Sequence, residues 1–440
     1  RVYKKRFWFK EMKISISGVR GIYGVDFFPQ DVIKFCNGFS KLIKSGKCAI
    51  GRDTRDTGDM IERLVSATLL EKGIDVEMLG VTPTPVVFMK AKELGAGIVI
   101  TSSHNPLDWN GLKFIIDGRG ITEEELDIVK NGNNTTKAKL GTEVAGESNY
   151  VSKATQVIGK LGQEKQVTVD IGGGSARYIA PELLRNIGCQ VTIVNEELDK
   201  CTRGPDPTSD KLTELISKTK EVGFAFDLDS DRMILVMNGE KKSSDITLGL
   251  GVVKAIKLGI KKFVLSLDSS IAVEKYIVNH GGEVWRSKVG EANVIQKMIE
   301  NNADAGGEGS SGGFILREFN MCRDGLLTSG LIASMIDDKN IQKEIEFFES
   351  FSQIRDKVSV ESSLHDKLIS EIAKVIGTRY EINQLDGIKV EIDENTWSLI
   401  RKSNTEDIIR ISTESNDKQV LEKVQKEMLE IVKSCYEKIK

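Results

Sequence analysis

A polar loop joins two apolar runs in the stretch Ile98-Val-Ile-Thr-Ser-Ser-His-Asn-Pro-Leu-Asp-Trp-Asn-Gly-Leu-Lys-Phe114. The first run predicts a buried strand over residues 97–101, and the serine loop that follows, residues 102–108, presents Ser103 where this strand ends. Open α/β sheets bind their ligands at that edge. A serine there acts as a nucleophile only if a neighbour such as His104 takes its proton or carries its negative charge. The alternative is an ordinary turn rich in serine, asparagine and proline.

A second motif places three carboxylates at alternate positions. This acidic loop reads Asp227-Leu-Asp-Ser-Asp-Arg232 and follows the apolar run Phe224-Ala-Phe226. In an extended chain alternate side chains point the same way, so we expect the three carboxylates to share one face. Oxygen ligands of this kind suit a hard cation, above all Mg²⁺. The alternative is an exposed acidic strand, and we favour the metal.

Two further motifs are suited to a sugar phosphate. The glycine-rich loop, Gly306-Gly-Glu-Gly-Ser-Ser-Gly-Gly313, surrounds one carboxylate with small residues that allow close approach by a polyhydroxylated ligand. The arginine loop, Arg401-Lys-Ser-Asn-Thr-Glu406, gathers cationic, hydroxyl and amide donors, with Arg410 beyond it. Such donors are those that hold phosphate.

The length of 440 residues is too great for one core and predicts three or four domains. Strand and helix patterns alternate through most of the chain, and the last segment reads as α+β. We therefore expect three related mixed α/β sheet domains plus a C-terminal α+β domain around a central cleft. The expected domains are 12–145 with the serine loop, 146–242 with the acidic loop, 243–343 with the glycine-rich loop and 344–440 with the arginine loop.

The composition excludes several classes of partner. The chain has 62 Lys+Arg and 65 Asp+Glu, a formal charge of −3, so it offers no global basic field for nucleic acid or an anionic membrane. The six cysteines show neither metal-binding spacing nor the density of a secreted scaffold. We expect a cytoplasmic protein, a monomer or homodimer, with a small-molecule partner.

The four motifs occur in the order found in the α-D-phosphohexomutases, and the sequence resembles this family from about Ser17 to about Glu414. The family contains phosphoglucomutase, phosphomannomutase and phosphoglucosamine mutase. The resemblance implies an isomerase that interconverts hexose 1-phosphate and hexose 6-phosphate through a phosphoserine enzyme and a bound hexose 1,6-bisphosphate. It also implies Mg²⁺ as the metal and glucose 1,6-bisphosphate as the activator or intermediate.

The resemblance also implies a role for particular residues. Ser103 would carry the phosphoryl group, His104 would orient the loop, Lys113 would act as general base and Arg20 would face the phosphoserine. Without the other motifs, Arg20 would read as a solvated turn residue and Lys113 as an exposed strand residue. The remaining implied residues are the metal ligands Ser103, Asp227, Asp229 and Asp231, the substrate-binding residues Arg232, Gly290, Glu308 and Ser310, and the phosphate-binding residues Arg401, Ser403, Asn404, Thr405 and Arg410.

The sequence departs from the family pattern in three places. Leu228 and Ser230 stand where the family usually has glycine, which would permit a positive φ and tight wrapping around an ion. We therefore expect either an extended loop or weakened metal binding. Ser311 reads as a one-residue insertion after Ser310, and Asp407 stands where proline is usual.

Within the family, Glu-Gly-Ser and Arg-x-Ser-Asn-Thr resemble the phosphomannomutase/phosphoglucomutase members, which we take as the main prediction. Phosphoglucosamine mutase is the close alternative, because a 2-amino group or a ring epimer differs by single polar contacts. A catalytically impaired paralogue that binds phosphosugars is the third possibility, suggested by the altered acidic loop and the extra serine. The serine, Lys113 and the phosphate-binding motif argue against it.

Some residues are expected to have no part in the chemistry. Residues 1–11 are basic and aromatic, without an apolar core long enough for a signal peptide or membrane span, and read as an upstream extension, a disordered tail or a partner-binding arm. His280 and His365 are expected at the surface. Arg52 and Asp53 are expected to serve packing and hydrogen bonding.

Overall fold

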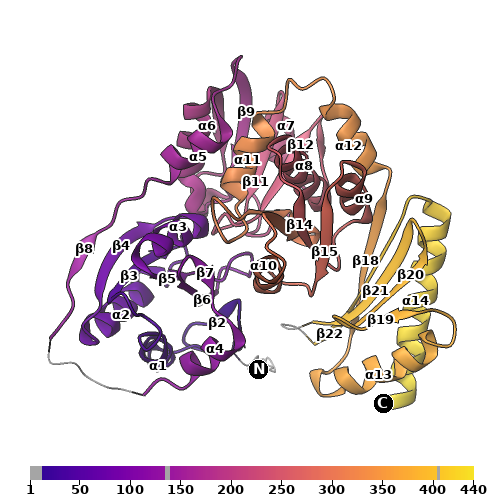
Figure 1. Ribbon diagram of the computed structural model, residues 1–440. Coiled ribbons are helices and arrows are strands. Elements are labelled where there is room, and N and C mark those ends of the chain that lie inside the picture. Colours follow the sequence, from indigo (N-terminus) through magenta and orange to yellow (C-terminus); the bar gives the residue numbers. More distant parts are fainter. Residues whose placement is uncertain (1–11, 134–138, 404–406) are drawn as a thin grey trace, which may run out of the picture. The chain divides into compact units, whose positions relative to one another are not determined.

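A computed structural model of the chain describes residues 12–133, 139–403 and 407–440. Figure 1 shows the helices and strands of the chain, which forms two compact units. The first contains the residues up to Ser243 together with Ile315–Ser334, and the second contains Ser244–Phe314 and Met335–Lys440. Within the described residues there are four β-sheets, and the sequence boundaries expected for four domains stay a prediction.

The first sheet carries the serine loop and has the strand order β1-β2-β6-β5-β3-β4-β8, with β7 paired to β6. Its parallel part is β5-β3-β4-β8, and β6 runs antiparallel to β5. The strands are β1 Lys13–Ser15, β2 Gly18–Ile22, β3 Lys47–Arg52, β4 Asp75–Val81, β5 Ala96–Ile100, β6 Trp109–Ile116, β7 Arg119–Gly120 and β8 Glu143–Ala145. The helices are α1 Pro29–Phe39, α2 Gly58–Glu71, α3 Thr84–Leu94 and α4 Glu123–Lys130.

The second sheet has the order β10-β9-β11-β12-β13, parallel from β10 to β11 and antiparallel beyond. Its strands are β9 Lys165–Asp170, β10 Cys189–Val194, β11 Val222–Phe226, β12 Met233–Met237 and β13 Glu240–Lys241. The helical segments are α5 Tyr150–Ile158, η1 Ser175–Arg177, α6 Ile179–Ile187, η2 Leu198–Lys200, α7 Thr213–Lys218 and, from later in the chain, α11 Gly325–Ala333. Helix α11 packs against α5 and α6.

The third sheet has the order β15-β14-β16-β17, with β14 parallel to both β15 and β16. Its strands are β14 Lys262–Ser266, β15 Glu283–Ser287, β16 Ala305–Glu308 and β17 Gly313–Leu316. The helical segments are α8 Ser244–Lys257, α9 Ile271–Asn279, α10 Glu291–Glu300, η3 Gly309–Ser311 and α12 Ile341–Glu349.

The fourth sheet is antiparallel throughout, in the order β18-β22-β21-β20-β19. Its elements are β18 Ser352–Ser359, η4 Ser362–Leu364, α13 His365–Ile376, β19 Ile382–Asn383, β20 Ile388–Asp393, β21 Thr396–Lys402, β22 Ile408–Ser415 and α14 Lys418–Ile439. Helices α13 and α14 both pack against this sheet. The last part of the chain is therefore α+β, as predicted.

The first three sheets share one topology. In each, the central strands lie in the order second, first, third and fourth along the chain: β4-β3-β5-β6, β10-β9-β11-β12 and β15-β14-β16-β17. The serine loop joins β5 to β6, the acidic loop joins β11 to β12, and the glycine-rich loop joins β16 to β17. Each loop thus leaves the carboxyl end of a third strand. The prediction of three related α/β domains is confirmed.

Helix α14 shows how side-chain spacing builds the core of the last sheet. Asp417 caps its first turn by accepting hydrogen bonds from the backbone N–H groups of Gln419 and Val420. Its apolar residues recur every three or four positions, so that one stripe faces the sheet and the lysines face solvent. The buried stripe is Leu421, Val424, Met428, Val432 and Cys435.

His280 and His365 were both expected at the surface, and the two predictions have different outcomes. His280 is exposed and stacks on Tyr276 with ring centroids 4.1 Å apart. His365 was expected at the surface, which is wrong: it is 3% exposed, and its Nε2 lies 3.0 Å from the carbonyl oxygen of Val360. The His365 side chain therefore stabilises the start of α13.

All six cysteines are free thiols. Among the described residues, no helix has both the length and the apolar character that crossing a membrane requires.

Candidate active site

Ser103 lies at the carboxyl end of β5 and is fully buried. Its φ of +50° is a left-handed conformation that residues other than glycine rarely adopt. The Ser103 N–H donates to Thr101 Oγ1 at 2.8 Å, and the Ser103 carbonyl oxygen accepts from Arg55 Nη2 at 2.6 Å. The backbone of the predicted nucleophile is therefore held on both sides.

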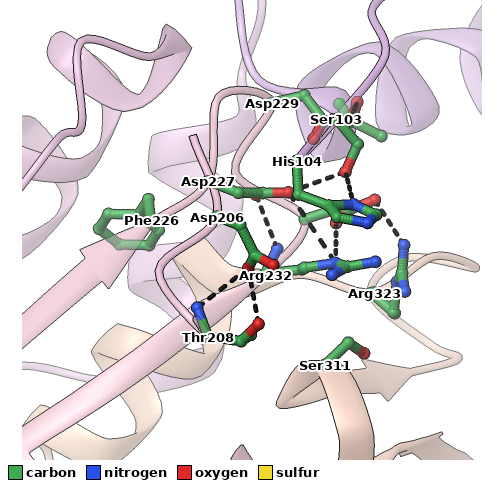
Figure 2. Close-up of polar contacts among 12 residues, drawn as sticks. Ser103, His104, Asp206, Thr208, Phe226, Asp227, Asp229, Arg232, Ser311 and Arg323 are labelled. Atoms are coloured by element: carbon green, nitrogen blue, oxygen red, sulfur yellow. Dashed lines mark hydrogen bonds and ion pairs between the residues drawn. The ribbon is translucent and has the colours of Figure 1, made fainter. Parts of the chain in front are cut away.

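The Ser103 hydroxyl faces the acidic loop (Figure 2). Ser103 Oγ donates to Asp227 Oδ2 at 2.8 Å, and His104 Nδ1 lies 3.3 Å from Ser103 Oγ. Burial raises the pKa of Asp227 well above its usual value, and the neighbouring carboxylates Asp229 and Asp231 add to this shift. Burial lowers the pKa of His104 well below its usual value, with cationic Arg232 contributing. The imidazole beside the hydroxyl is thus held neutral.

The acidic loop is a turn, so of the two expected alternatives, an extended loop and weakened metal binding, the first is wrong. The Ser230 N–H donates to the Asp227 carbonyl oxygen at 3.2 Å, and Ser230 has a φ of +60°. Leu228 is buried, and its carbonyl oxygen accepts from both N and Oγ of Ser175 at 2.8 Å. Ser230 adopts the left-handed conformation that glycine would supply. One oxygen from each of Asp227, Asp229 and Asp231 lies within 4.8 Å of the others.

Cationic side chains surround these carboxylates. Lys113 Nζ lies 2.6 Å from Asp229 Oδ2 and 2.8 Å from Asp231 Oδ2. Arg323 Nη2 lies 2.8 Å from the same oxygen of Asp231, and Arg232 Nε lies 3.9 Å from Asp231 Oδ1. Burial acts to raise the pKa of Asp231, but Arg323, Lys113 and Arg232 outweigh it and hold that pKa well below its usual range. Asp231 is therefore a carboxylate.

The donor set fits a divalent cation. Asp229 Oδ1 and Asp231 Oδ1 are buried and form no hydrogen bond with the described residues. Leaving a buried carboxylate oxygen without a partner is costly, and a cation held by three carboxylates would remove that cost. Oxygen-only ligands are those that Mg²⁺ prefers. The predicted metal ligands are the three aspartates and Ser103 Oγ. The structure brings them together, since Ser103 Oγ donates a hydrogen bond to Asp227.

Arg20 and Arg232 are placed beside these loops by different elements. Arg20 lies on β2, which pairs with β6, and its Nη1 donates to Asn105 Oδ1 of the serine loop at 3.0 Å. Burial lowers the pKa of Arg20, and Asp229 opposes this shift. Arg232 ends the acidic loop, and its N–H donates to Asp227 Oδ1 at 3.2 Å. The first unit thus brings the predicted Arg20, Ser103, Lys113 and Arg232 around one acidic cluster.

Of the predicted substrate-binding residues, Arg232 lies in the first unit, and Gly290, Glu308 and Ser310 lie in the second. Glu308 ends β16, and its Oε1 accepts from the Gly290 N–H at 2.7 Å. Gly290 has a φ of +122°, which allows the chain to turn into α10. Ser310 is partly exposed, whereas Ser311 is buried and its Oγ donates to the Glu308 carbonyl oxygen at 3.3 Å. Of the two serines, Ser310 is therefore the more exposed residue.

The predicted phosphate-binding residues also lie in the second unit. Arg401 on β21 and Arg410 on β22 are directly opposite each other in the antiparallel ladder. Like charges in this position disfavour pairing unless an anion lies between or beside them. The Ser403 N–H donates to the Ile408 carbonyl oxygen at 3.0 Å, and Asp407, the residue in the place of proline, accepts from Ser362 Oγ. The predicted Asn404 and Thr405 lie outside the described residues.

Three residues near Ser103 and the acidic loop were missed by sequence reasoning. Arg323 contacts Asp231 although it is 92 residues away in sequence, so only the fold reveals it. Thr84 donates through Oγ1 to Asp229 Oδ2 at 2.7 Å from the start of α3. Arg55, in the motif Gly51-Arg-Asp-Thr-Arg-Asp-Thr-Gly58, is fully buried against the serine loop. The density of charge in this motif was the one available signal.

Comparison with protein families assigns the class. Four domain models of the phosphoglucomutase/phosphomannomutase type match the chain: alpha/beta/alpha domain I over residues 11–140, domain II over 148–240, domain III over 245–352 and the C-terminal domain over 357–431. The chain therefore belongs to the α-D-phosphohexomutase family, whose members are isomerases that move a phosphoryl group within a sugar phosphate.

Similar proteins narrow the resemblance. A probable phosphoglucosamine mutase of Methanosphaera stadtmanae is 33% identical, covering 93% of this chain and 96% of that protein. A phosphoglucosamine/phosphogalactosamine mutase of Sulfurisphaera tokodaii is 31% identical, covering 94% and 98%. Among solved structures, a phosphoglucomutase/phosphomannomutase family protein of Burkholderia thailandensis has a TM-score of 0.83 with 22% identity, covering 96% and 98%, which shows a shared fold.

Proposed function

We propose that this phosphohexomutase is a phosphoglucosamine mutase that interconverts the 1-phosphate and the 6-phosphate of an amino hexose. The names of its relatives from M. stadtmanae and S. tokodaii support an amino sugar over mannose or glucose. This reverses the order of the two substrates predicted from the motifs. The observation that carries the activity is the buried Ser103 hydroxyl, 2.8 Å from Asp227 Oδ2 and surrounded by cationic side chains.

In the proposed cycle Ser103 Oγ carries a phosphoryl group. A hydroxyl of the bound sugar monophosphate attacks the phosphorus, the new O–P bond forms, the P–Oγ bond breaks, and the hydroxyl proton passes through the general base to the departing Ser103 Oγ. The bisphosphate then reorients, and its original phosphoryl group returns to Ser103 by the reverse step. Transfer of this kind depends mostly on positioning and on charge stabilisation.

The cationic residues have distinct parts in this proposal. Lys113 is the proposed general base, as the resemblance implies. In its ammonium form, with Nζ 2.6 Å from Asp229 Oδ2 and 2.8 Å from Asp231 Oδ2, it would stabilise charge together with Arg20 and Arg232. His104 Nδ1, 3.3 Å from Ser103 Oγ, is placed to orient the hydroxyl and exchange its proton.

Mg²⁺ held by Asp227, Asp229, Asp231 and Ser103 Oγ would neutralise charge on the transferring phosphoryl group. The turn at Ser230 keeps the three carboxylates convergent. This convergence argues against the impaired sugar-binding paralogue, because the altered loop retains the expected ligand geometry.

In the second unit, Glu308 and Ser310 are proposed to grip the sugar hydroxyls, with Gly290 orienting the glutamate. Arg401, Ser403 and Arg410, with Asn404 and Thr405, are proposed to hold the phosphate that is not reacting. Glucose 1,6-bisphosphate is the proposed activator. A cytoplasmic location and a monomeric or homodimeric state remain proposals from composition.

The test is the intact mass of the purified protein before and after incubation with Mg²⁺ and glucose 1,6-bisphosphate, with peptide mapping of Ser103. We expect a gain of one phosphate on Ser103, absent from S103A and prevented by EDTA. Glucosamine 6-phosphate should discharge it faster than mannose or glucose 6-phosphate. Faster discharge by mannose or glucose 6-phosphate would restore phosphomannomutase/phosphoglucomutase as the function. No phosphorylation under any condition would favour the impaired paralogue.

A further inference from the structure

Arg55 is a fully buried arginine in the first unit, 1% exposed, in the loop that follows β3. A buried guanidinium is unfavourable unless its hydrogen-bond donors have partners. Arginine has five N–H donors in a fixed planar fork, and no other side chain offers the same set. The partners of these five groups therefore reveal which structure the residue stabilises.

All five donors are used, and four of the partners belong to the serine loop or its exit. Nε donates to Asp53 Oδ2 at 3.0 Å. The other acceptors are the backbone carbonyl oxygens of Ser103 at 2.6 Å and Asn105 at 2.7 Å for Nη2, and of Pro106 and, at 2.8 Å, Trp109 for Nη1. The guanidinium of Arg55 thus cross-links the backbone of the serine loop from its start to its exit.

These contacts converge on Ser103. Its left-handed φ of +50° is unfavourable for serine and persists only if surrounding contacts hold it. Arg55 holds its carbonyl oxygen, while Thr101 Oγ1 accepts from its N–H and donates to Asp53 Oδ2 at 2.6 Å. The Asp53–Arg55 ion pair therefore fixes both sides of the residue whose hydroxyl faces Asp227.

We propose that Arg55 is a positioning residue for phosphoryl transfer: it holds Ser103 in the left-handed conformation that directs Oγ at the acidic loop. This inference rests on the proposed function for its kinetic consequence. The conformational consequence, a loosened serine loop without Arg55, does not depend on that function.

The decisive variant is R55K, with R52K as the matched control. Lysine keeps the charge but has three donors, so it cannot satisfy four carbonyl oxygens and Asp53. Arg52 lies three residues earlier, and its Nε donates to Glu62 Oε2 at 3.1 Å rather than to the serine loop. A misplaced nucleophile costs on the order of 100-fold in rate. We expect R55K to lower kcat by about that factor with KM within about threefold, and R52K to retain both values.

Hydrogen–deuterium exchange supplies a readout that a general loss of stability would not reproduce. Backbone amides of the serine loop and Trp109 should exchange faster in R55K, while those of β9 and β11 keep the wild-type rate. For R55A, guanidinium at tens of millimolar should restore part of kcat relative to the same concentration of sodium chloride. A wild-type kcat and wild-type exchange in R55K would overturn the proposal. So would faster exchange throughout the first unit with wild-type kcat per folded molecule.

The outcomes also separate this inference from the proposed function. If wild-type protein takes no phosphate on Ser103, the proposed function fails, and the exchange measurement still decides whether Arg55 holds the loop. If the wild-type protein is active and R55K behaves as R52K does, the function stands and only the role of Arg55 is rejected.

Discussion

At the scale of single residues, the acidic loop shows how two departures from the family pattern are accommodated. Ser230 takes the left-handed backbone with a φ of +60°, which costs a residue other than glycine roughly 1–2 kcal/mol. Leu228 does not need that conformation, and its side chain is 1% exposed. Ser230 therefore replaces glycine at a position with a left-handed backbone, whereas Leu228 adds a buried apolar side chain to the core.

This distinction predicts unequal effects of two substitutions. S230G exchanges the strain of a left-handed serine for the greater backbone entropy of unfolded glycine, so the free energy of unfolding should change by less than about 1 kcal/mol. L228A empties a buried site and should cost about 2–4 kcal/mol. Urea unfolding of both variants measures the difference. Equal destabilisation by the two substitutions would contradict this account of the loop.

At the scale of elements, the start of α11 places a cation on the acidic loop. Asp324 caps the helix by accepting from the Leu327 N–H at 2.9 Å, and it also accepts from Tyr150 Oη at 2.5 Å. The residue before it, Arg323, extends to Asp231. The geometry of one helix cap therefore fixes one of the charges around the predicted metal ligands.

The cap also predicts a pH dependence of stability. Burial raises the pKa of Asp324 to about 6, despite the hydrogen bonds from Leu327 and Tyr150 that favour the charged form. A raised pKa means that the folded protein binds this proton more tightly than the unfolded chain does. The contribution of this proton to the free energy of unfolding is therefore full below about pH 4, the pKa in the unfolded chain. It is lost as the pH rises through about 6, the pKa in the folded protein.

The variant D324N should lack the pH-dependent contribution that Asp324 makes to the free energy of unfolding. Between pH 4 and pH 7 the wild-type protein should lose about 2–3 kcal/mol of stability relative to D324N, which keeps an oxygen acceptor but does not titrate. Urea unfolding at several pH values, with the surface variant D199N as control, gives this difference. Parallel pH profiles for wild type and D324N would show that Asp324 titrates normally in the folded protein.

At the scale of the whole molecule, the four motif loops are divided between two units. Serine and acidic loops belong to the first, and the glycine-rich and arginine loops belong to the second. In the second unit the cross-strand pair Arg401 and Arg410 concentrates positive charge on adjacent strands. A phosphate ligand should therefore stabilise the whole protein by mass action.

We expect glucose 1,6-bisphosphate at 100 times its Kd to add about 2.7 kcal/mol to the stability of the wild-type protein. In R401Q the loss of a charge-assisted hydrogen bond should weaken binding by about 10- to 100-fold, so this gain should fall to about 1.4 to 0.4 kcal/mol at the same ligand concentration. Thermal unfolding with and without ligand measures both. The control is R379Q, which removes an exposed arginine paired with Glu427. An undiminished ligand-induced rise in Tm for R401Q would remove Arg401 from the phosphate site.

Much of the fold and of the candidate site could be predicted from the sequence. Alternating apolar runs identified the strands, and motifs at their ends identified Ser103, the three aspartates and Glu308, because strand periodicity and loop chemistry are local properties. The strand before Ser103 was expected at 97–101 and is found at Ala96–Ile100. The buried His365 and the turn of the acidic loop were predicted wrongly, because burial and backbone conformation depend on neighbours that are distant in sequence.

The sequence by itself determined the family, the order of the domains and the residue types of the candidate site, because these follow from short motifs and from composition. Only the tertiary structure decided which side chains meet. Arg55 reaches the serine loop, Arg323 reaches Asp231 and Thr84 reaches Asp229 across separations of 48 to 145 residues. Such contacts arise from the packing of sheets and helices, and no local pattern of residues records them.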